Sequence, residues 1–288
     1  MKIRFIINPI SGTGKQKGIE KLITKMLINL DYDIVYTQKG GDATRLSSEA
    51  VRDDIDAVVA VGGDGTVNEC LIGLVKSNTA LGVIPCGSGN GFAYHIGMSR
   101  IVEKAIVQLK DAKTETIDSC TANGAPFVNV SGIGFDAHIA NLFAELKERG
   151  FINYAKLILK ELSYKPQEYT LQYKGLDRKV KAFMISFANA SQYGNNARIS
   201  PMADVQDGLL DFVIVKDFPK WRIPVFLLKV FRGKTHLSKY VEIIQCQKMH
   251  ISAKNTLLHL DGEPYKASNP VEIRLIPKSL KILIPNEK

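Results

Sequence analysis

Through about residue 115, short apolar runs alternate with segments whose apolar side chains recur every three or four positions. Runs rich in β-branched residues predict buried strands, whereas the longer spacing predicts amphipathic helices. Strands that alternate with helices are typical of an open, parallel α/β sheet. The predicted strands are Ile3–Ile7, Ile34–Thr37, Ala57–Val61 and Leu81–Pro85, and the predicted helices include Ile19–Leu30 and Ile101–Leu109.

From Thr116 onward the apolar runs are shorter, and most of them alternate apolar with polar residues. Alternation with a period of two and short turns predicts antiparallel strands, here in a β-sandwich-like domain. Two helices are expected to interrupt these strands, at Ala137–Ser163 and Pro219–Arg232. The expected strands are Thr116–Cys120, Phe127–Val130, Tyr169–Tyr173, Val180–Asn189, Leu209–Lys216, Tyr240–Cys246, Met249–Ala253, Thr256–Leu260, Val271–Ile276 and Leu280–Ile284.

This change of pattern predicts two domains, residues 1–120 and residues 121–288. The predicted fold class is α/β, with a parallel N-terminal domain followed by a β-sandwich-like C-terminal domain. Because no low-complexity linker separates the two, we expect them to pack together with a cleft between them.

The strand Ala57–Val61 leads directly into Gly62-Gly63-Asp64-Gly65, and a helical pattern follows. Glycines allow a ligand to approach the backbone closely, and the N–H groups at a helix start favour phosphate. Asp64 would place a carboxylate beside that phosphate, where Mg²⁺ or a hydroxyl proton would be handled. The alternative interpretation is a purely structural turn between a strand and a helix.

Two more glycine-rich turns, at residues 8–15 and 86–91, also follow predicted strands. The carboxyl ends of parallel strands lie at one edge of a sheet, so the three turns can converge on one site. The first turn contains Gly12-Thr13-Gly14-Lys15 but is not a Walker A loop, because an earlier glycine is missing. A plain strand-to-helix turn remains the alternative there.

The net charge of +9 favours an anionic partner, namely a phosphorylated ligand, nucleic acid or an acidic membrane, unless it serves solubility alone. Nucleic acid is disfavoured because the basic residues are dispersed and no recognition module is visible. The four cysteines have no metal-type spacing, which favours a reducing, cytoplasmic compartment. No apolar run approaches the ~20 residues of a membrane span, so any membrane contact is expected to be peripheral.

Four motifs occur in a characteristic order: the turn from Asn8 to Gly12, then Gly62 to Glu69, Pro85 to Asn90, and Leu260 to Pro264. In this arrangement the sequence resembles the diacylglycerol kinase catalytic-domain family, which includes bacterial lipid kinases and the sphingosine and ceramide kinases. The resemblance covers nearly the whole chain. Gly-Gly-Asp-Gly alone is shared with NAD kinases and phosphofructokinases, whereas the following Asn-Glu and the late Asp-Gly-Glu are more specific.

The resemblance implies an α/β nucleotide domain, a β-rich lipid-substrate domain, and a last strand at about 279–286 that returns to the first domain. It implies ATP and Mg²⁺ as cofactors. It implies Glu263 as the proton acceptor, Asp64 as a second candidate for that role or for a metal role, and Asp261 as a nearby alternative. The residues implied around ATP are Asn8, Pro9, Ile10, Ser11, Gly12, Thr37, Gly62, Gly63, Asp64, Gly65, Thr66, Val67, Asn68, Glu69 and Ser88.

A structural Mg²⁺ site is also implied by the resemblance, between Ser200 and Leu209. Asp207 would give a carboxylate, while Asp204 and Leu209 would give backbone carbonyls. Gln206 replaces an acid that some relatives have at this site, so the site is weaker or absent in this interpretation.

The expected reaction moves the γ-phosphoryl group of ATP to a lipid hydroxyl, which requires positioning, charge neutralisation and a proton acceptor. The alternatives are a soluble kinase of the NAD-kinase type and a non-catalytic lipid- or nucleotide-binding protein. Which lipid is phosphorylated is left open between diacylglycerol, a sphingoid base, ceramide, an isoprenoid alcohol and phosphatidylglycerol. The oligomeric state is also open, with a homodimer among the options.

The stretch from Phe218 to Lys234 joins Trp221 with bulky apolar and basic residues. Such a composition suits an interfacial helix on anionic headgroups, while a helix packed on the sheet is the alternative. The turn Gly132–Asp136 either lines the lipid entrance or is structural. His259 alternates with apolar residues and is expected to be structural.

Overall fold

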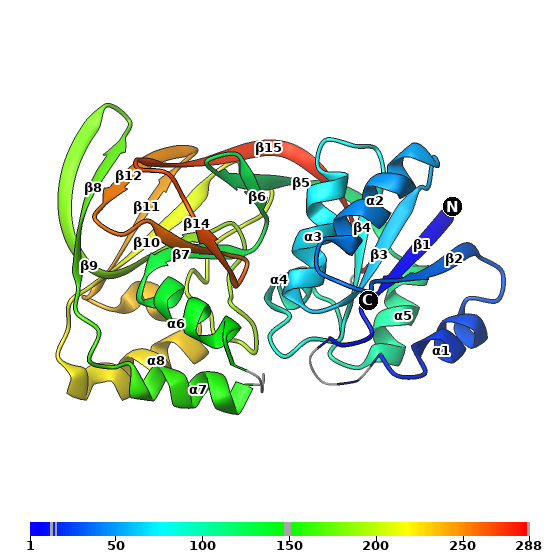
Figure 1. Cartoon of the computed structure of the whole chain (residues 1–288), viewed down its shortest axis with the longest axis horizontal. Helices are drawn as coiled ribbons and strands as arrows, with labels where there is room; N and C mark the ends of the chain where they lie inside the picture. The colour runs from blue at the N-terminus through cyan, green and yellow to red at the C-terminus, as the bar shows by residue number, and fades with distance from the viewer. Residues whose placement is uncertain (12–13, 15, 147–150, 287–288) are drawn as a thin grey trace. The chain divides into compact units, whose positions relative to one another are not determined.

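The computed structural model describes residues 1–11, 14, 16–146 and 151–286 (Figure 1). Its internal contacts divide the chain into two units. Unit 1 consists of Met1–Ile117 with Lys278–Lys288, and unit 2 is Asp118–Pro277. The strands β5 (Lys113–Ala122) and β15 (Val271–Ile284) each begin in one unit and end in the other.

Unit 1 is built on the parallel strands β1 (Lys2–Ile7), β2 (Asp31–Tyr36), β3 (Ala57–Gly62) and β4 (Ala80–Pro85). Their order is β4-β3-β1-β2, and the end of β15 adds a parallel neighbour to β4 through the pair Ile282 and Leu81. Every residue of β3 and β4 is buried. Such continuous burial arises when helices cover both faces of a parallel sheet.

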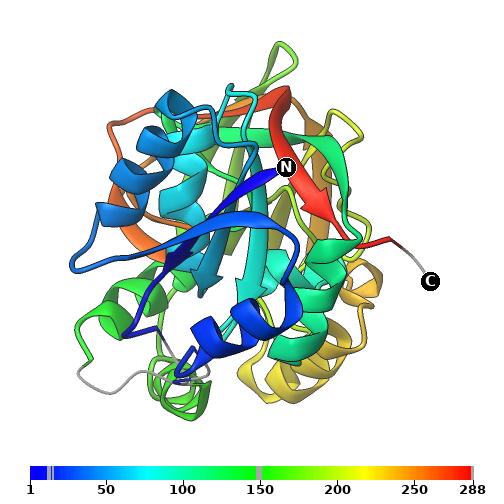
Figure 2. The ribbon, with the colours of Figure 1, turned by 90° about the vertical axis from the view of Figure 1, so that its right-hand side faces the viewer.

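The described residues of unit 1 form the helices α1 (Ile19–Met26), α2 (Asp42–Arg52), α3 (Asp64–Leu74), α4 (Gly91–His95) and α5 (Val102–Lys110). Helices α2 and α3 pack together on one face of the sheet, and α1 and α5 lie on the other (Figure 2). The chain therefore leaves the neighbouring strands β1 and β3 toward opposite faces. This arrangement is a topological switch point, the place where open α/β sheets bind their ligands.

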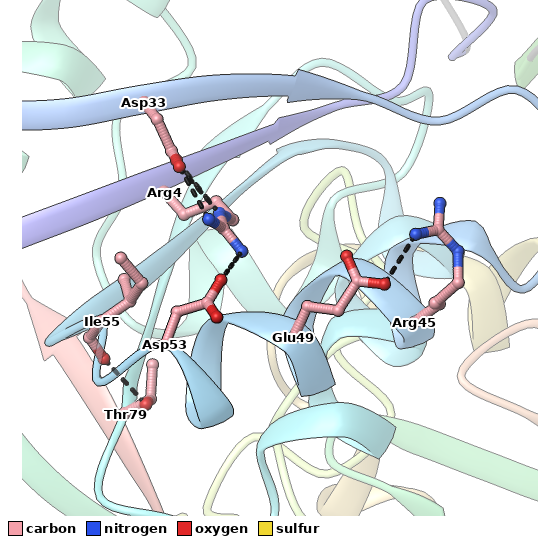
Figure 3. A network of polar contacts seen from close by, with 7 residues as sticks. All are labelled: Arg4, Asp33, Arg45, Glu49, Asp53, Ile55 and Thr79. Carbon is pink, nitrogen blue, oxygen red and sulfur yellow. Dashed lines mark hydrogen bonds and ion pairs between the residues drawn. The ribbon is translucent and has the colours of Figure 1, made fainter.

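Ion pairs join the elements of unit 1 away from the glycine turns (Figure 3). The guanidinium of Arg4 on β1 lies 2.8 Å from Asp33 on β2 and 3.1 Å from Asp53, which follows α2. The Thr79 hydroxyl donates to the Ile55 carbonyl at 2.8 Å, which ties the start of β4 to the start of β3. These contacts brace the side of the sheet where β3 and β4 begin, whereas the glycine turns lie where they end.

Unit 2 is mainly antiparallel. Its strands are β6 (Ala125–Phe127), β7 (Val130–Gly134), β8 (Gln167–Tyr173), β9 (Leu176–Ala188), β10 (Leu210–Lys216), β11 (Val241–Cys246), β12 (Lys248–Ala253), β13 (Leu257–Leu260) and β14 (Glu263–Lys266). A core that includes Phe127, Phe187 and Phe212 fills the space between them. The parallel first part and antiparallel second part confirm the predicted fold class.

A second apolar cluster in unit 2 holds the helices α6 (Phe135–Ala144), α7 (Phe151–Lys160) and α8 (Ile223–Phe231). The short 3-10 turns η1 (Lys220–Arg222) and η2 (Thr235–Leu237) flank α8. Within the described part of the chain, no helix is both long enough and apolar enough to cross a bilayer.

The prediction of one helix over Ala137–Ser163 is wrong, because the chain forms α6 and α7 instead. The two helices fold back on each other. The rings of Phe143 and Tyr154 meet edge to face at 5.2 Å, and His138 lies 2.9 Å from Glu161. Both helices thus share one apolar cluster, which a continuous helix could not do. Residues 147–150 lie outside the described residues.

Three strand predictions also differ from the structure. The strand expected at Phe127–Val130 is divided into β6 and β7. The N–H groups of Val128 and Asn129, between the two strands, donate to the Asp261 carboxylate and not to a neighbouring strand. The two strands expected at Val271–Ile276 and Leu280–Ile284 are the single strand β15, which includes Lys278 with a positive φ of 48°. The short strand β14 was not expected, and its second residue is Pro264.

Candidate active site

The three glycine turns of unit 1 are hydrogen-bonded to one another at the carboxyl ends of β1, β3 and β4. The Asn8 N–H donates to the Val61 carbonyl at 3.0 Å, and its side-chain amide donates to the Thr66 hydroxyl at 3.2 Å. The Cys86 N–H donates to the Gly62 carbonyl at 2.8 Å. The sequence prediction that these turns meet at one edge of the sheet therefore agrees with the structure of this unit.

Two of these turns approach so closely that only glycine fits. A Cβ atom on Gly87 would lie 2.5 Å from the Gly63 Cα, and one on Gly62 would lie 2.4 Å from the Thr66 hydroxyl oxygen. Asn90 fixes the third turn in a left-handed conformation, with φ of 55°. Its side-chain oxygen accepts the Gly87 N–H at 2.9 Å, and its side-chain nitrogen donates to the Gly87 carbonyl at 2.7 Å. Glycine at positions 62 and 87 therefore allows this close packing of the backbone.

Helix α3 begins at this point. Gly63 is its N-cap in an extended conformation, and Asp64 is its first residue. The Val67 N–H donates to the Gly63 carbonyl at 3.1 Å, which closes the first turn. Gly63, Asp64 and Gly65 are half-buried, while Thr66 and Val67 are buried. The amides of a first helical turn and the helix dipole together favour an anion such as phosphate.

Asn68 and Glu69 lie on the next turn of α3 and are half-buried. The Glu69 carboxylate accepts the Ala43 N–H at 3.1 Å, and its carbonyl accepts the Thr44 hydroxyl at 2.9 Å. Glu69 therefore joins the starts of α2 and α3. This structural contact was not visible in the sequence, because its partners lie about 25 residues away. The expectation that Asn68 and Glu69 lie near ATP stays a prediction.

The turn after β1 is an Asx turn, in which the Asn8 side chain holds its own backbone. The Asn8 side-chain oxygen accepts the Ile10 N–H at 3.1 Å, and its carbonyl accepts the Ser11 N–H at 3.3 Å. The Pro9 carbonyl accepts the Gln16 side-chain amide at 2.7 Å. Ile10 is 87% exposed, whereas Ser11 is buried near Gly63.

Three further predicted nucleotide contacts complete the set. Thr37 is buried, and its N–H donates to the Ile7 carbonyl at 3.0 Å, so it extends the pairing of β1 with β2. Ser88 is half-buried beside Gly87 in the third turn. Gly12 lies outside the described residues.

The acidic turn predicted in the β-rich half is a two-residue hairpin in unit 2. Asp261 and Gly262 join β13 to β14 with φ angles of 50° and 98°, as expected for the Asp-Gly hairpin signal. Asp261 is 5% exposed, and its two carboxylate oxygens accept the N–H groups of Val128 and Asn129 at 3.0 and 2.9 Å. Glu263, the first residue of β14, is exposed. This geometry favours a positioning role for Asp261 and leaves Glu263 as the carboxylate that an acceptor can reach.

His259 is hydrogen-bonded to the same turn. The Gly262 N–H donates to His259 Nδ1 at 3.2 Å, so the proton of a neutral imidazole is on Nε2. That atom lies 3.3 Å from an oxygen of Asp136, which also accepts the Tyr193 hydroxyl at 3.0 Å. Ser186 donates to the same oxygen at 3.2 Å. The sequence predicted His259 as structural but gave no signal for this cluster, because its members come from distant parts of the chain.

The loop predicted to hold a structural cation contains two carboxylates with backbone partners, and a third carboxylate, from β5, also binds its backbone. Asp204 accepts the Gln206 N–H at 2.9 Å, Asp207 accepts the Leu209 N–H at 2.8 Å, and Asp118 accepts the Gly208 N–H at 2.9 Å. Burial, and then the charges of the neighbouring carboxylates, raise the pKa of Asp207. A cation would relieve that repulsion.

Among the described residues, no group of three or more His, Cys, Asp or Glu side chains is arranged to hold a metal ion. The expected site would use one carboxylate and two backbone carbonyls, so it is not of that kind and stays a prediction.

Comparison with known families gives two matches that together span most of the chain. Residues 2–122 match the diacylglycerol kinase catalytic domain. Residues 129–284 match the YegS C-terminal NAD kinase beta sandwich-like domain.

Named proteins similar to this chain are lipid kinases. A Chromohalobacter salexigens protein named probable lipid kinase YegS-like is 32% identical over 86% of this chain and 82% of its own length. The diacylglycerol kinase of Mycobacterium tuberculosis is 29% identical over 99% and 95%, and that of Bacillus subtilis is 26% identical over 100% and 97%.

Solved structures share the fold. A crystal structure of a Bacillus anthracis diacylglycerol kinase has a TM-score of 0.75 at 21% identity, over 99% of this chain and 97% of that one. Another crystal structure from that organism has a TM-score of 0.83 at 23% identity, over 99% and 95%. With both domain matches and the 32% identical relative, the chain belongs to the family of diacylglycerol kinases and YegS-like lipid kinases, and it is a phosphotransferase.

Proposed function

We propose that this lipid kinase transfers the γ-phosphoryl group of ATP to the hydroxyl of a diacylglycerol-like or sphingoid lipid, with Mg²⁺. One observation carries the proposal. Three glycine turns, one of which opens α3, are hydrogen-bonded together at a topological switch point. The diacylglycerol kinase names of two relatives support diacylglycerol as the first acceptor to test.

In this proposal the first turn of α3 binds the phosphates through backbone N–H groups, with no Cβ on Gly63 or Gly65 to keep them away. Asp64 would hold Mg²⁺, which when bound neutralises the charge that develops on the transferred group. The carboxylate at the first position of α3 is a suitable oxygen ligand for that ion. At this site the positive charge of the cation and the negative charge of the phosphates would neutralise each other.

Glu263 is the proposed proton acceptor for the lipid hydroxyl. Its carboxylate is exposed, whereas both oxygens of Asp261 already accept backbone N–H groups. A base must reach the proton that it removes, so the exposed acid is the better candidate. Asp261 and His259 would then act by fixing the hairpin from which Glu263 projects.

The lipid acceptor suggests work at a membrane surface. We therefore include in the proposal a cytoplasmic, peripheral location on an anionic membrane, in keeping with the net charge of +9.

The test is an assay of purified protein with ATP labelled at the γ-phosphate, Mg²⁺ and a total lipid extract in detergent micelles, followed by identification of the labelled product. We expect label in a phosphorylated lipid and none when Mg²⁺ is replaced by a chelator. Parallel reactions with NAD test the soluble-kinase alternative. Label in NADP, or ATP turnover that is independent of lipid, would overturn the proposal.

A further inference from the structure

One side of α8 and of the turn η1 that precedes it carries large apolar side chains that face water. Trp221 is 70% exposed, Val225 50%, Leu228 49% and Phe231 44%. Residues three or four positions apart lie on the same side of a helix, so these four form one continuous stripe. Scattered exposed apolar residues are ordinary, but a continuous stripe of them marks an interaction surface.

The opposite side of α8 is anchored to unit 2. Val230 is buried, and Phe226 packs against the second apolar cluster with its ring 5.3 Å from that of Phe218. The Val230 carbonyl accepts the Arg198 N–H at 3.1 Å. Helices that are apolar on all sides are normally buried on all sides. Here the helix is held by one side only, and its apolar outer side has no cover within the described chain.

Neighbouring elements also carry exposed apolar side chains. The Lys229 ammonium donates to the Leu237 carbonyl at 2.7 Å, which holds η2 against α8, and Leu237 is 60% exposed. Helix α7 packs against the same apolar cluster and lies along the same edge of unit 2 (Figure 1). Leu159 on α7 is 61% exposed.

The charged residues of the segment that carries the stripe are all of one sign. Between Phe218 and Val241 the chain has six basic residues and no Asp or Glu. The guanidinium of Arg222 lies 4.4 Å from the ring centre of Trp221, so a cation accompanies the most exposed aromatic ring. The six basic residues are Lys220, Arg222, Lys229, Arg232, Lys234 and Lys239, and together with the apolar stripe they are called the α8 surface below.

We propose that the α8 surface docks on an anionic lipid bilayer, with Trp221, Leu228 and Phe231 in the interface and the basic side chains on the headgroups. Aromatic and aliphatic residues bordered by Lys and Arg are the combination by which interfacial helices bind such membranes. A protein partner would place acidic groups against the cations and would not require a stripe that is apolar throughout. The choice of a bilayer as partner rests on the proposed function, because a lipid kinase meets its acceptor there.

Vesicle sedimentation of the intact protein, without ATP, tests this inference. The vesicles are phosphatidylcholine alone or phosphatidylcholine with phosphatidylglycerol, each at low and high salt. The wild-type protein is expected to bind the anionic vesicles, to bind the neutral ones weakly, and to lose affinity as salt rises. The double variant Trp221→Ala/Leu228→Ala should weaken binding about tenfold, given the apolar area removed.

Matched controls separate the α8 surface from general effects. Leu176→Ala/Ile101→Ala removes side chains that are 58% and 51% exposed elsewhere, and it should bind like wild type. Lys220→Gln/Arg232→Gln should weaken binding about fivefold for each charge at low salt, whereas Lys104→Gln/Lys110→Gln should not. Thermal unfolding and circular dichroism verify that each variant is folded.

Two results with the Trp221→Ala/Leu228→Ala variant would overturn the inference. One is equal vesicle binding by wild type and Trp221→Ala/Leu228→Ala. The other is a wild-type dimer that this variant converts to monomer, because the α8 surface would then be covered by a second copy. Kinase activity on acceptor in detergent micelles is measured separately. Vesicle binding without kinase activity would overturn the proposed function alone, and activity in micelles without vesicle binding would overturn the docking alone.

Discussion

At the scale of single residues, the two acids of the Asp-Gly-Glu turn have different surroundings. Asp261 is buried under two backbone N–H donors, and Glu263 two positions later is exposed. The two-residue Asp-Gly turn explains the difference. Asp261 lies within the turn, whereas Glu263 is the first residue of the next strand, so the two side chains need not face the same way. The motif therefore combines a structural acid with a chemically available one.

Replacing Asp261 by Asn tests its structural role. An amide can accept only one of the two N–H groups and directs its own NH₂ toward the other, so the variant should lose about 1–3 kcal/mol of unfolding free energy. Chemical denaturation gives this value, and Asp177→Asn at the exposed start of β9 serves as control, with a change within about 0.5 kcal/mol. A variant of unchanged stability that has lost activity would instead assign Asp261 a chemical role.

Residue-level prediction succeeded where the signal is local. The glycines of the three turns were identified because a strand, a turn and a helix follow each other within about ten positions. The cluster of His259, Asp136 and Tyr193 was not, because its bonds join residues 57 and more positions apart. Hydrogen bonds between residues so far apart in the sequence depend on how the strands pack together. The sequence pattern alone does not show that packing.

At the scale of elements, periodicity predicted the type of nearly every strand and helix but not all of their limits. The predicted ends of strands and helices were wrong where contacts between distant residues outweigh the local sequence pattern. Phe143 on Tyr154 folds α6 back on α7, and the Asp261 carboxylate takes the amides between β6 and β7. Strand β15 continues through Pro277 and Lys278, whereas the sequence pattern alone predicted a break between two strands there.

Three neighbouring strands of unit 2 are joined by one ionic network, which makes their stability depend on pH. The Glu242 carboxylate on β11 binds Arg178 on β9 and lies 2.9 Å from the Lys216 ammonium on β10. Hydrogen bonding with Arg178, and then with Lys216, lowers the pKa of Glu242 to about 2.

A lowered pKa in the folded state stabilises the fold above the unfolded pKa, and this contribution disappears as pH falls toward the folded value. For Glu242 the window runs from about 4.5 down to about 2. The melting temperature of wild type should exceed that of Glu242→Gln at pH 6, and the two should converge as pH falls through this window. Exposed Glu168→Gln is the control. A constant difference across the pH range would contradict the linkage.

At the scale of the whole molecule, the change from alternating strands and helices to period-two strands predicted both architectures. That prediction succeeded because a strand that is buried on both faces has a continuous apolar sequence, whereas a strand that is buried on one face alternates apolar with polar residues. Each unit would contribute a different part of the proposed reaction. The glycine turns and Asp64 belong to unit 1, and the Asp261–Glu263 turn belongs to unit 2.

The most direct measurement is therefore a steady-state comparison of Glu263→Gln and Gly87→Ala with wild type, with γ-labelled ATP and diacylglycerol in micelles. Glu263→Gln should lower kcat by about 10²–10⁴ with little change in KM for ATP, since it removes only the proton acceptor. Gly87→Ala should raise KM for ATP about tenfold or more, because its Cβ would meet the Gly63 backbone, and Gly40→Ala, whose Cβ would meet nothing closer than 4.0 Å, should not. Near-normal turnover by folded Glu263→Gln would contradict the account.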